Sequence, residues 1–239
     1  SDDWLAADAC EKLLALIKGK NADCIVCGLK QTSGNIWAPA FDKDYSDLAS
    51  FKCDFIYWIN TELLSSSVNK IYKRGLITEL YPENMSFGED LVFVLNYLKH
   101  CNRISFTQEP LYQHEVYNSV SLTHSFSPAR FSNLEDIQKA ILDFADDKNK
   151  INPRIYDKYV KDALHLTRMW YKNKNVPYIR KKEIIGEWLK QSYIRKLKIS
   201  DYQLHWKDRM LLHCLHMSCF IGINLIVNGK EYINSLSKE

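Results

Sequence analysis

Phe87-Gly88-Glu89-Asp90-Leu91-Val92-Phe93 places a pair of carboxylates directly after a glycine and at the start of an apolar repeat. Apolar residues recur at helical spacing from Leu91 to about Cys101, which predicts a helix after a glycine turn. Glu89 and Asp90 then lie in the first turn, where unpaired backbone N–H groups and the helix dipole favour negative charge. Acidic residues in a first turn are usually caps, so a catalytic role depends on what else the fold brings near them.

Composition indicates an ordinary globular chain: 239 residues, 46% hydrophobic and 26% charged, are enough to bury a sizeable core. The net charge of +3, with no basic run interleaved with aromatic residues, argues against a nucleic-acid partner. The charge is unevenly distributed. Residues 171–209 hold eleven Lys or Arg against four Asp or Glu, a net charge of +7, which leaves −4 for the remainder.

The cysteines indicate reduced thiols in a cytoplasmic protein, because they are odd in number and lie among apolar residues. They are Cys10, Cys24, Cys27, Cys53, Cys101, Cys214 and Cys219. The Cys24-Ile25-Val26-Cys27 sequence resembles a redox or zinc motif but falls inside a strand-like apolar run, so burial is the favoured interpretation. No signal peptide is visible, and the first residues resemble the interior of a longer protein.

Helical and strand patterns alternate over the first half of the chain. Helical spacing over residues 6–18 is followed by an apolar run of strand length over 23–30 and by a returning strand over 36–39. After the central helix, residues 103–107 and 111–116 predict two short strands. This alternation predicts an α/β fold.

The pattern becomes helical from Ser132 onward. Ser132-Asn133-Leu134-Glu135 matches a capping box, in which a serine caps the helix start and a glutamate bonds back to it. Further helices are predicted over 155–170, 182–193 and 203–227. The last is interrupted by polar residues, which argues against a transmembrane span. With the basic segment before it, this helix either lies on an anionic bilayer surface or packs on the α/β body.

Four short blocks together resemble family 2 glycosyltransferases, inverting nucleotide-sugar enzymes with a GT-A fold. Ser1-Asp2-Asp3-Trp4-Leu5 is similar to the end of the D-S-D-D-W element of that family. Residues 68–74, 87–93 and 111–121 resemble three further blocks, in the order in which the family has them. The resemblance covers roughly residues 1–123.

The resemblance implies two domains. Residues 1–128 would be the C-terminal half of a Rossmann-like GT-A domain, which carries the acceptor side and the catalytic base. Residues 129–239 would be a helical C-terminal extension, similar to those of bacterial members that build capsule, exopolysaccharide or lipopolysaccharide. Nothing in the chain resembles the nucleotide-binding half, so this chain alone is expected to be incomplete and to lack transfer activity.

The resemblance also implies catalytic and metal-binding residues. Asp90 matches the general base, which takes the proton from the acceptor hydroxyl as that oxygen displaces the nucleotide diphosphate with inversion. Glu89 would hydrogen-bond the acceptor or orient the base, and a swap of these two roles stays open. Asp2 and Asp3 match the D-x-D element, whose carboxylates hold Mn²⁺ or Mg²⁺. Asp2 would be its second acidic position, and Asp3 is expected to support the loop more than to bind metal.

The remaining site residues are expected to bind substrate: Asn69, Lys70, His114, Ser119 and Ser121. Family members often carry an arginine just before the Asn-Ser pair, where this chain has Val116 and Tyr117. His114 could supply a hydrogen-bond donor or a metal ligand instead, or be a strand histidine satisfied by a neighbour.

The implied function is metal-dependent transfer of a sugar from a nucleotide-sugar, a UDP-sugar by preference, to a saccharide or lipid-linked acceptor. The protein is expected in the cytoplasm, with peripheral contact to the inner face of the plasma membrane through the C-terminal helices. The alternative is a non-catalytic, truncated transferase module that docks on a membrane or on a polysaccharide-assembly partner. The transferase hypothesis requires that the N-terminal acidic residues and the glycine-led helix face a shared cavity.

Overall fold

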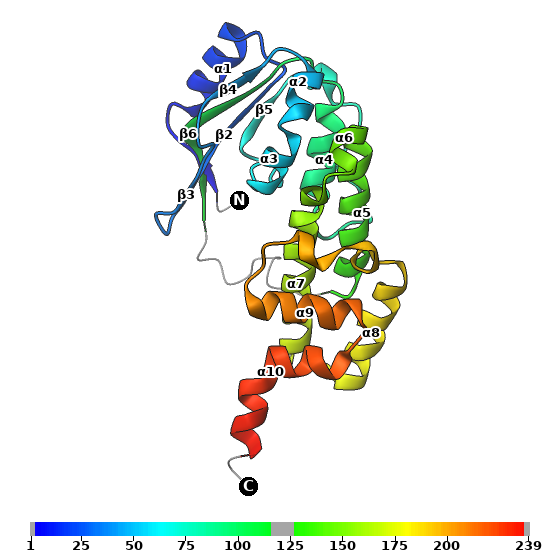
Figure 1. Ribbon diagram of the computed structural model, residues 1–239. Coiled ribbons are helices and arrows are strands. Elements are labelled where there is room, and N and C mark those ends of the chain that lie inside the picture. The colour runs from blue at the N-terminus through cyan, green and yellow to red at the C-terminus, as the bar shows by residue number, and fades with distance from the viewer. Residues whose placement is uncertain (1–2, 116–126, 237–239) are drawn as a thin grey trace. The chain divides into compact units, whose positions relative to one another are not determined.

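The computed structural model describes residues 3–115 and 127–236 (Figure 1). Contacts group the chain into two compact units. Unit 1 comprises residues 1–125 and 139–151, and unit 2 comprises residues 126–138 and 152–239. The helix α5 (Ala129–Phe144) contributes residues to both units. The division into domains at residue 128 stays a prediction.

Unit 1 is built on a mixed sheet with six strands among the described residues (Figure 1). The strands are β1 (Trp4–Leu5), β2 (Cys24–Gln31), β3 (Ile36–Trp37), β4 (Lys43–Tyr45), β5 (Lys70–Tyr72) and β6 (Ile104–His114). The central pair, β2 and β6, is parallel and pairs Cys24 with Ile104 at one end and Gln31 with His114 at the other. Short antiparallel strands flank this pair: β4 and β1 lie along β6, and β5 and β3 lie along β2. The predicted α/β class is confirmed.

The parallel pair is irregular around Gly28, which pairs with Pro110. A Cβ atom at Gly28 would lie 2.8 Å from the Ala38 Cβ and 3.1 Å from the Pro110 Cα, so only glycine fits this close approach. The two strands predicted over 103–107 and 111–116 are in fact one continuous strand, β6. The prediction was wrong because a proline usually ends a strand, and here it is accommodated at the register irregularity.

Helices pack on both faces of the sheet (Figure 1). The helix α1 (Ala9–Gly19), as predicted, buries Ala9 and Leu13 against Ile25, Cys27 and Leu111. An aromatic cluster built on α2 (Leu48–Cys53) and α3 (Phe55–Asn60) packs elsewhere on the sheet. In this cluster the rings of Trp58 and Phe106 stack with centroids 3.7 Å apart. The core of unit 1 is therefore apolar and aromatic.

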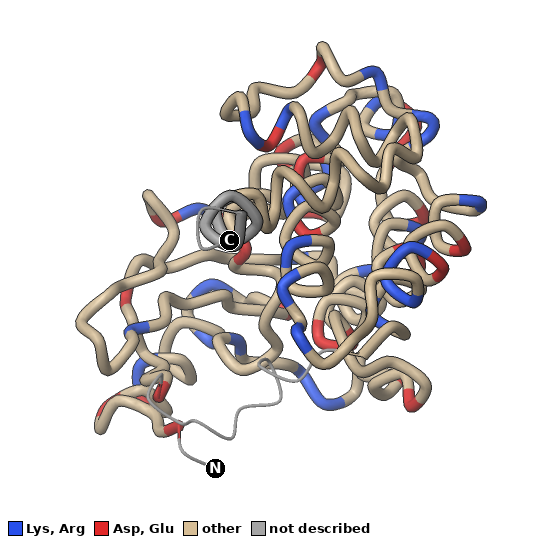
Figure 2. Tube along the Cα trace, turned by 90° about the horizontal axis from the view of Figure 1, so that it is seen from below, with Lys and Arg blue, Asp and Glu red and all other residues tan. Residues whose placement is uncertain are grey.

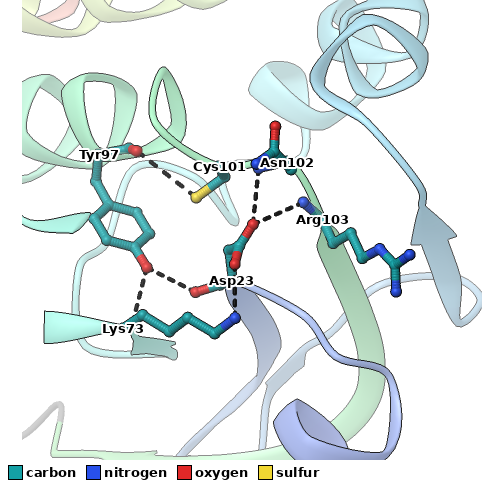
Figure 3. A network of polar contacts seen from close by, with 6 residues as sticks. All are labelled: Asp23, Lys73, Tyr97, Cys101, Asn102 and Arg103. Atoms are coloured by element: carbon teal, nitrogen blue, oxygen red, sulfur yellow. Dashed lines mark hydrogen bonds and ion pairs between the residues drawn. The ribbon is translucent and has the colours of Figure 1, made fainter. Parts of the chain in front are cut away.

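A polar network fixes α4 (Glu89–Leu98) to the strands that begin beside it (Figure 3). The Asp23 carboxylate accepts hydrogen bonds from the backbone N–H groups of Asn102 (2.8 Å) and Arg103 (3.0 Å). It also forms an ion pair with Lys73 Nζ (2.8 Å). The Tyr97 hydroxyl donates to the Asp23 carbonyl (2.6 Å). Partial burial by itself would raise the pKa of Asp23, but the Lys73 ammonium and the two N–H groups hold it below its usual value.

Unit 2 is helical in its described part. It contains α7 (Asp157–Lys172), α8 (Tyr178–Gln191), α9 (Trp206–His216) and α10 (Phe220–Leu236), with short 3₁₀ turns η3 (Pro153–Tyr156), η4 (Tyr193–Lys196) and η5 (Ile199–Asp201). The single helix predicted over 203–227 is wrong, because it breaks between α9 and α10 at Ser218, whose φ of 53° lies in the left-handed region.

The capping box predicted at Ser132 and Glu135 is also wrong. The helix α5 begins earlier, at Ala129, so both residues lie inside it. The Ser132 hydroxyl donates back to the Ala129 carbonyl (2.7 Å), and the partly buried Glu135 carboxylate accepts hydrogen bonds from other elements of unit 2. A serine three residues before a glutamate is therefore not enough to place a helix start.

The remaining sequence features concern thiols and membranes. Burial of the Cys24-Cys27 motif is confirmed, and desolvation raises the pKa of Cys24 to about 12 and that of Cys27 to about 11.

Within residues 3–115 and 127–236, no helix has the length and apolarity needed to cross a membrane. Figure 2 shows basic and acidic positions mixed along the helices. Contact of the C-terminal helices with a membrane surface stays a prediction.

Candidate functional site

A cavity of about 460 Å³ in unit 1 brings together residues that are far apart in the sequence. Asp3, Asn69, Asp90 and His114 all line it, although 87 positions separate the first carboxylate from the second. The cavity lies at the carboxyl ends of the parallel strands β2 and β6, because Leu29 near the end of β2 and His114 at the end of β6 both line it. Open α/β sheets usually bind their ligands outside these strand ends. The predicted cavity shared by the N-terminal acidic segment and the glycine-led helix is confirmed for Asp3 and Asp90.

Asp90 is placed by the start of α4. Gly88 precedes this helix with a φ of 76°, a left-handed conformation that glycine adopts without a Cβ clash. The resulting turn puts Asp90 in the first helical turn and directs its carboxylate to Ser67. The Ser67 hydroxyl donates to Oδ1 (2.9 Å) and the Ser67 N–H donates to Oδ2 (3.3 Å). The carboxylate is thus held in orientation while it lines the cavity.

Asp3 lies near the N-terminus, and the pairing of β1 with β6 holds it in place. Trp4 pairs with Gln113, which brings the N-terminal segment alongside the end of β6. The Asp3 carboxylate accepts one hydrogen bond from the Tyr112 hydroxyl (2.8 Å) and another from the Glu115 N–H (2.8 Å). Burial and the hydrogen bond to Asp3 raise the pKa of Tyr112. These contacts tie Asp3 to the end of β6, and its role in supporting the loop more than binding metal stays a prediction.

His114, the last residue of β6, has an unusual ring nitrogen. Its Nδ1 is shielded from solvent and has no hydrogen-bond partner within the described residues. A buried polar atom without a partner is costly and is common where a ligand or ion completes the site. An imidazole nitrogen and a carboxylate that line the same cavity are donor types that a divalent cation accepts. No cluster of three or more His, Cys, Asp or Glu able to hold a metal occurs in the described ranges, and Asp2 lies outside them.

Asn69 and Lys70, predicted to bind substrate, are used within the fold. The Asn69 side-chain amide donates to the Cys27 carbonyl (2.9 Å). The buried Lys70 ammonium donates to the Leu63 carbonyl (2.7 Å), to the Ser66 carbonyl and to the Asn69 Oδ1 (2.7 Å). Burial lowers the pKa of Lys70 to about 8. Asn69 still borders the cavity, whereas the ammonium of Lys70 binds the backbone of the preceding turn.

The other predicted site residues are distributed differently. Glu89 is the first residue of α4 and does not line the cavity, although its neighbour Asp90 does. Asp2, Ser119 and Ser121 lie outside the described residues. Their roles, and the catalytic role of Glu89, stay predictions.

The turn over residues 61–66 forms a wall of the cavity that the sequence did not predict. Glu62 has a φ of 64°, which is unfavourable for a residue other than glycine. Its carboxylate accepts a hydrogen bond from the Ser65 hydroxyl (2.9 Å), and the Ser65 N–H donates to its carbonyl (3.0 Å). The only signal in the sequence is the polar run Ser65-Ser66-Ser67 between two apolar segments, which indicates a turn but no function.

A larger cavity, of about 570 Å³, lies elsewhere in unit 1, near Lys20, Asp44 and Arg103. Its Asp44 carboxylate is already paired with Lys20 (2.7 Å). It contains none of the residues that the sequence predicted to act. Size alone therefore does not identify the functional site.

Comparison with known proteins identifies the fold. No family model matches the chain, and no curated protein matches it in sequence. Solved structures of S. aureus TarS, residues 1–349, do match it. The complex with UDP-GlcNAc is 18% identical with a TM-score of 0.60, covering 97% of this chain and 66% of that one. The complex with UDP is 17% identical with a TM-score of 0.61, covering 97% and 65%.

A further TarS structure of the same length is 15% identical, with a TM-score of 0.62 and coverage of 97% and 64%. The chain thus spans slightly less than two thirds of the TarS chains that it matches. At these identities the likeness concerns the fold. It confirms that the described α/β sheet and helices follow the same fold as these TarS structures.

Proposed function

We propose that this chain is the acceptor side of an inverting, metal-dependent glycosyltransferase that moves a sugar from a nucleotide-sugar to an acceptor hydroxyl. The observation that carries the proposal is the cavity in which Asp3, Asp90 and His114 meet. The matched TarS structures, one in complex with UDP-GlcNAc and another with UDP, support a nucleotide-sugar donor. TarS is a glycosyltransferase, which supports the reaction class.

Asp90 acts as the general base. An alcohol is a weak nucleophile until a positioned group accepts its proton, which contributes about 10²–10⁴-fold to the rate. Two hydrogen bonds from Ser67 orient the carboxylate, and the cavity gives the acceptor hydroxyl access to it. The acceptor oxygen attacks the anomeric carbon from the face opposite the leaving diphosphate, so a single displacement inverts the configuration.

The leaving diphosphate develops negative charge that must be neutralised. A divalent cation, Mn²⁺ or Mg²⁺, supplies this neutralisation when bound. In this chain the cation would be held by Asp2 and by His114, whose Nδ1 has no hydrogen-bond partner among the described residues. Asp3 positions the segment through its bonds to Tyr112 and Glu115. We place the reaction in bacterial surface-polysaccharide synthesis at the cytoplasmic face of the membrane, in line with the resemblance.

The test is a donor screen on the protein as its gene encodes it, with Mn²⁺ and UDP-GlcNAc as the first donor. Release of UDP is measured for the wild type, for Asp90→Asn and for a control, Asp147→Asn. Asp147 also lies in the first turn of a helix, α6 (Asp147–Lys150), but is fully exposed and remote from the cavity. We expect Asp90→Asn to reduce turnover by about 10²–10⁴-fold while UDP still binds, and Asp147→Asn to change nothing.

Two outcomes contradict the proposal. Retained turnover in Asp90→Asn removes that residue from the mechanism. A wild-type protein that transfers no sugar from any nucleotide-sugar supports the alternative of a non-catalytic module.

A further inference from the structure

The cavity has an apolar wall that the proposed mechanism does not use. Trp37, on β3, lines the cavity and leaves 54% of its surface exposed. Val68 also lines it and is 43% exposed, and Leu29 and Leu63 complete the apolar part. A large aromatic ring left in solvent beside a candidate catalytic base marks a contact surface for a ligand.

The rest of the lining is polar and carries acidic groups. Asp3, Glu62 and Asp90 contribute three carboxylates, and no lysine or arginine is among the lining residues that the structure describes. A sugar with a phosphate or carboxylate group would meet these like charges and find no lining ammonium or guanidinium to pair with, since the cation proposed at His114 serves the leaving diphosphate. The volume of about 460 Å³ lies within the range of about 300–1,000 Å³ that small-molecule sites occupy. The cavity therefore suits a neutral molecule of modest size.

The two kinds of wall specify the class of that molecule. A sugar ring has an apolar face of C–H groups and a rim of hydroxyls. An indole takes the C–H face, because the negative face of the aromatic ring attracts the partly positive hydrogens. The Glu62 carboxylate and the hydroxyls of Thr61, Ser65 and Ser66 offer partners for a hydroxyl rim. The left-handed backbone at Glu62 and its bond to Ser65 fix part of this polar wall.

We propose that this cavity binds the neutral sugar ring of the acceptor, with the C–H face of the ring stacked on Trp37 and a hydroxyl presented to Asp90. That the bound sugar is the acceptor rests on the proposed function, since it depends on Asp90 as the base. Trp37 is then a specificity-determining residue. A second ligand class, an anionic sugar, is disfavoured by the charge of the lining.

The binding test is saturation-transfer NMR on the 239-residue chain with methyl glycosides of glucose, galactose and N-acetylglucosamine as probes. We expect binding of at least one glycoside, with the strongest transfer to the ring C–H protons. Trp37→Ala should weaken it by about fivefold or more, and Trp37→Phe should restore most of it. The control is Ile36→Ala, because Ile36 lies on the same short strand, is 55% exposed and points to the opposite face.

The charge test compares the best glycoside with glucose 6-phosphate and glucuronic acid, which we expect to bind at least tenfold more weakly. The proposal is overturned if neither the glycosides nor the charged sugars bind. It is also overturned if the charged sugars bind as well as the best glycoside, or if Ile36→Ala and Trp37→Ala lose binding equally. Circular dichroism of both variants shows whether the chain is still folded.

The outcomes separate this inference from the proposed function. If glycosides bind through Trp37 and no nucleotide-sugar is turned over, the sugar site stands and the transferase proposal fails. If turnover is normal and Trp37→Ala changes neither glycoside binding nor the acceptor KM, the transferase proposal stands and the sugar site is wrong.

Discussion

Asp90 in unit 1 and Glu135 in unit 2 are both helix carboxylates preceded by a sequence pattern that suggests a cap, yet their surroundings differ. Within the described residues Asp90 receives hydrogen bonds from Ser67 alone, and it lines a cavity. Glu135 receives the Tyr159 hydroxyl (2.6 Å), the Trp188 indole N–H (2.6 Å) and the Tyr193 backbone N–H (3.2 Å) inside a helical core. The number of donors that the fold supplies separates a carboxylate free to act on a ligand from one committed to the structure.

The difference extends to the energetics of the two regions. Burial raises the pKa of Glu135, although the Tyr159, Trp188 and Tyr193 donors offset part of the desolvation cost. Removing a buried group of this kind leaves its donors unpaired. Asp90 has lighter support, so its substitution should affect chemistry more than stability. The following predictions test this contrast, beginning with the largest expected effect.

The largest effect should be the loss of transfer in Asp90→Asn without loss of stability. We expect turnover to fall by about 10²–10⁴-fold. The free energy of unfolding should change by less than about 1 kcal/mol, since an asparagine oxygen can still accept from the Ser67 hydroxyl. Enzyme assay and urea denaturation of the same preparation measure both quantities. A variant that is both inactive and strongly destabilised would erase the contrast with Glu135.

Glu135→Ala should reduce stability, in contrast to Asp90→Asn. We expect it to destabilise unit 2 by about 3 kcal/mol, because three donors lose their acceptor in the interior. Amide hydrogen exchange should accelerate in α7, which carries Tyr159, and much less in β2 of unit 1. Asp143→Ala, at an exposed position on the same helix, is the matched control. Equal acceleration in both units would show that the network is not local to unit 2.

The pH dependence of stability should differ between Asp23→Asn and the wild type. The pKa of Asp23 is depressed in the folded state, so its contribution is fully present above the unfolded value of about 3.9 and is lost as pH falls through the folded pKa. The difference in unfolding free energy should be about 2 kcal/mol at pH 7, and it should shrink below about pH 4. Denaturation at several pH values measures it. A difference that is constant with pH would mean that the charge of Asp23 contributes nothing.

The smallest effect is expected from Ser67→Ala, which removes one of the two bonds that orient Asp90. A bond worth about 1 kcal/mol predicts a reduction of about fivefold in kcat. The acceptor KM should change little, because the serine acts through the base. Ser132→Ala, in unit 2, is the control, since its hydroxyl bonds only to the carbonyl of its own helix. A larger effect on KM than on kcat would give Ser67 a direct role in binding.

Local patterns in the sequence predicted much of the fold because the responsible forces act over a few residues. Helical spacing located α1 and α4, and a run of apolar residues located β2. Local patterns failed where a distant contact overruled them. Pro110 stays within β6 because Gly28 on the neighbouring strand permits the irregularity, and the Ser132 pattern is overruled by a helix that starts at Ala129.

For the candidate site, the sequence by itself determined the chemical groups: a carboxylate after a glycine turn, an acidic N-terminal segment and a histidine near the end of a strand. These are properties of residue type and local conformation, and they can be read in order along the chain. Only the tertiary structure decided that Asp3, Asp90 and His114 share one cavity and that Trp37 and Glu62 join them. It also committed the Lys70 ammonium to backbone carbonyls. The physical reason is that access, pairing and burial depend on atoms contributed by β2, β6 and the 61–66 turn together, which no local pattern contains.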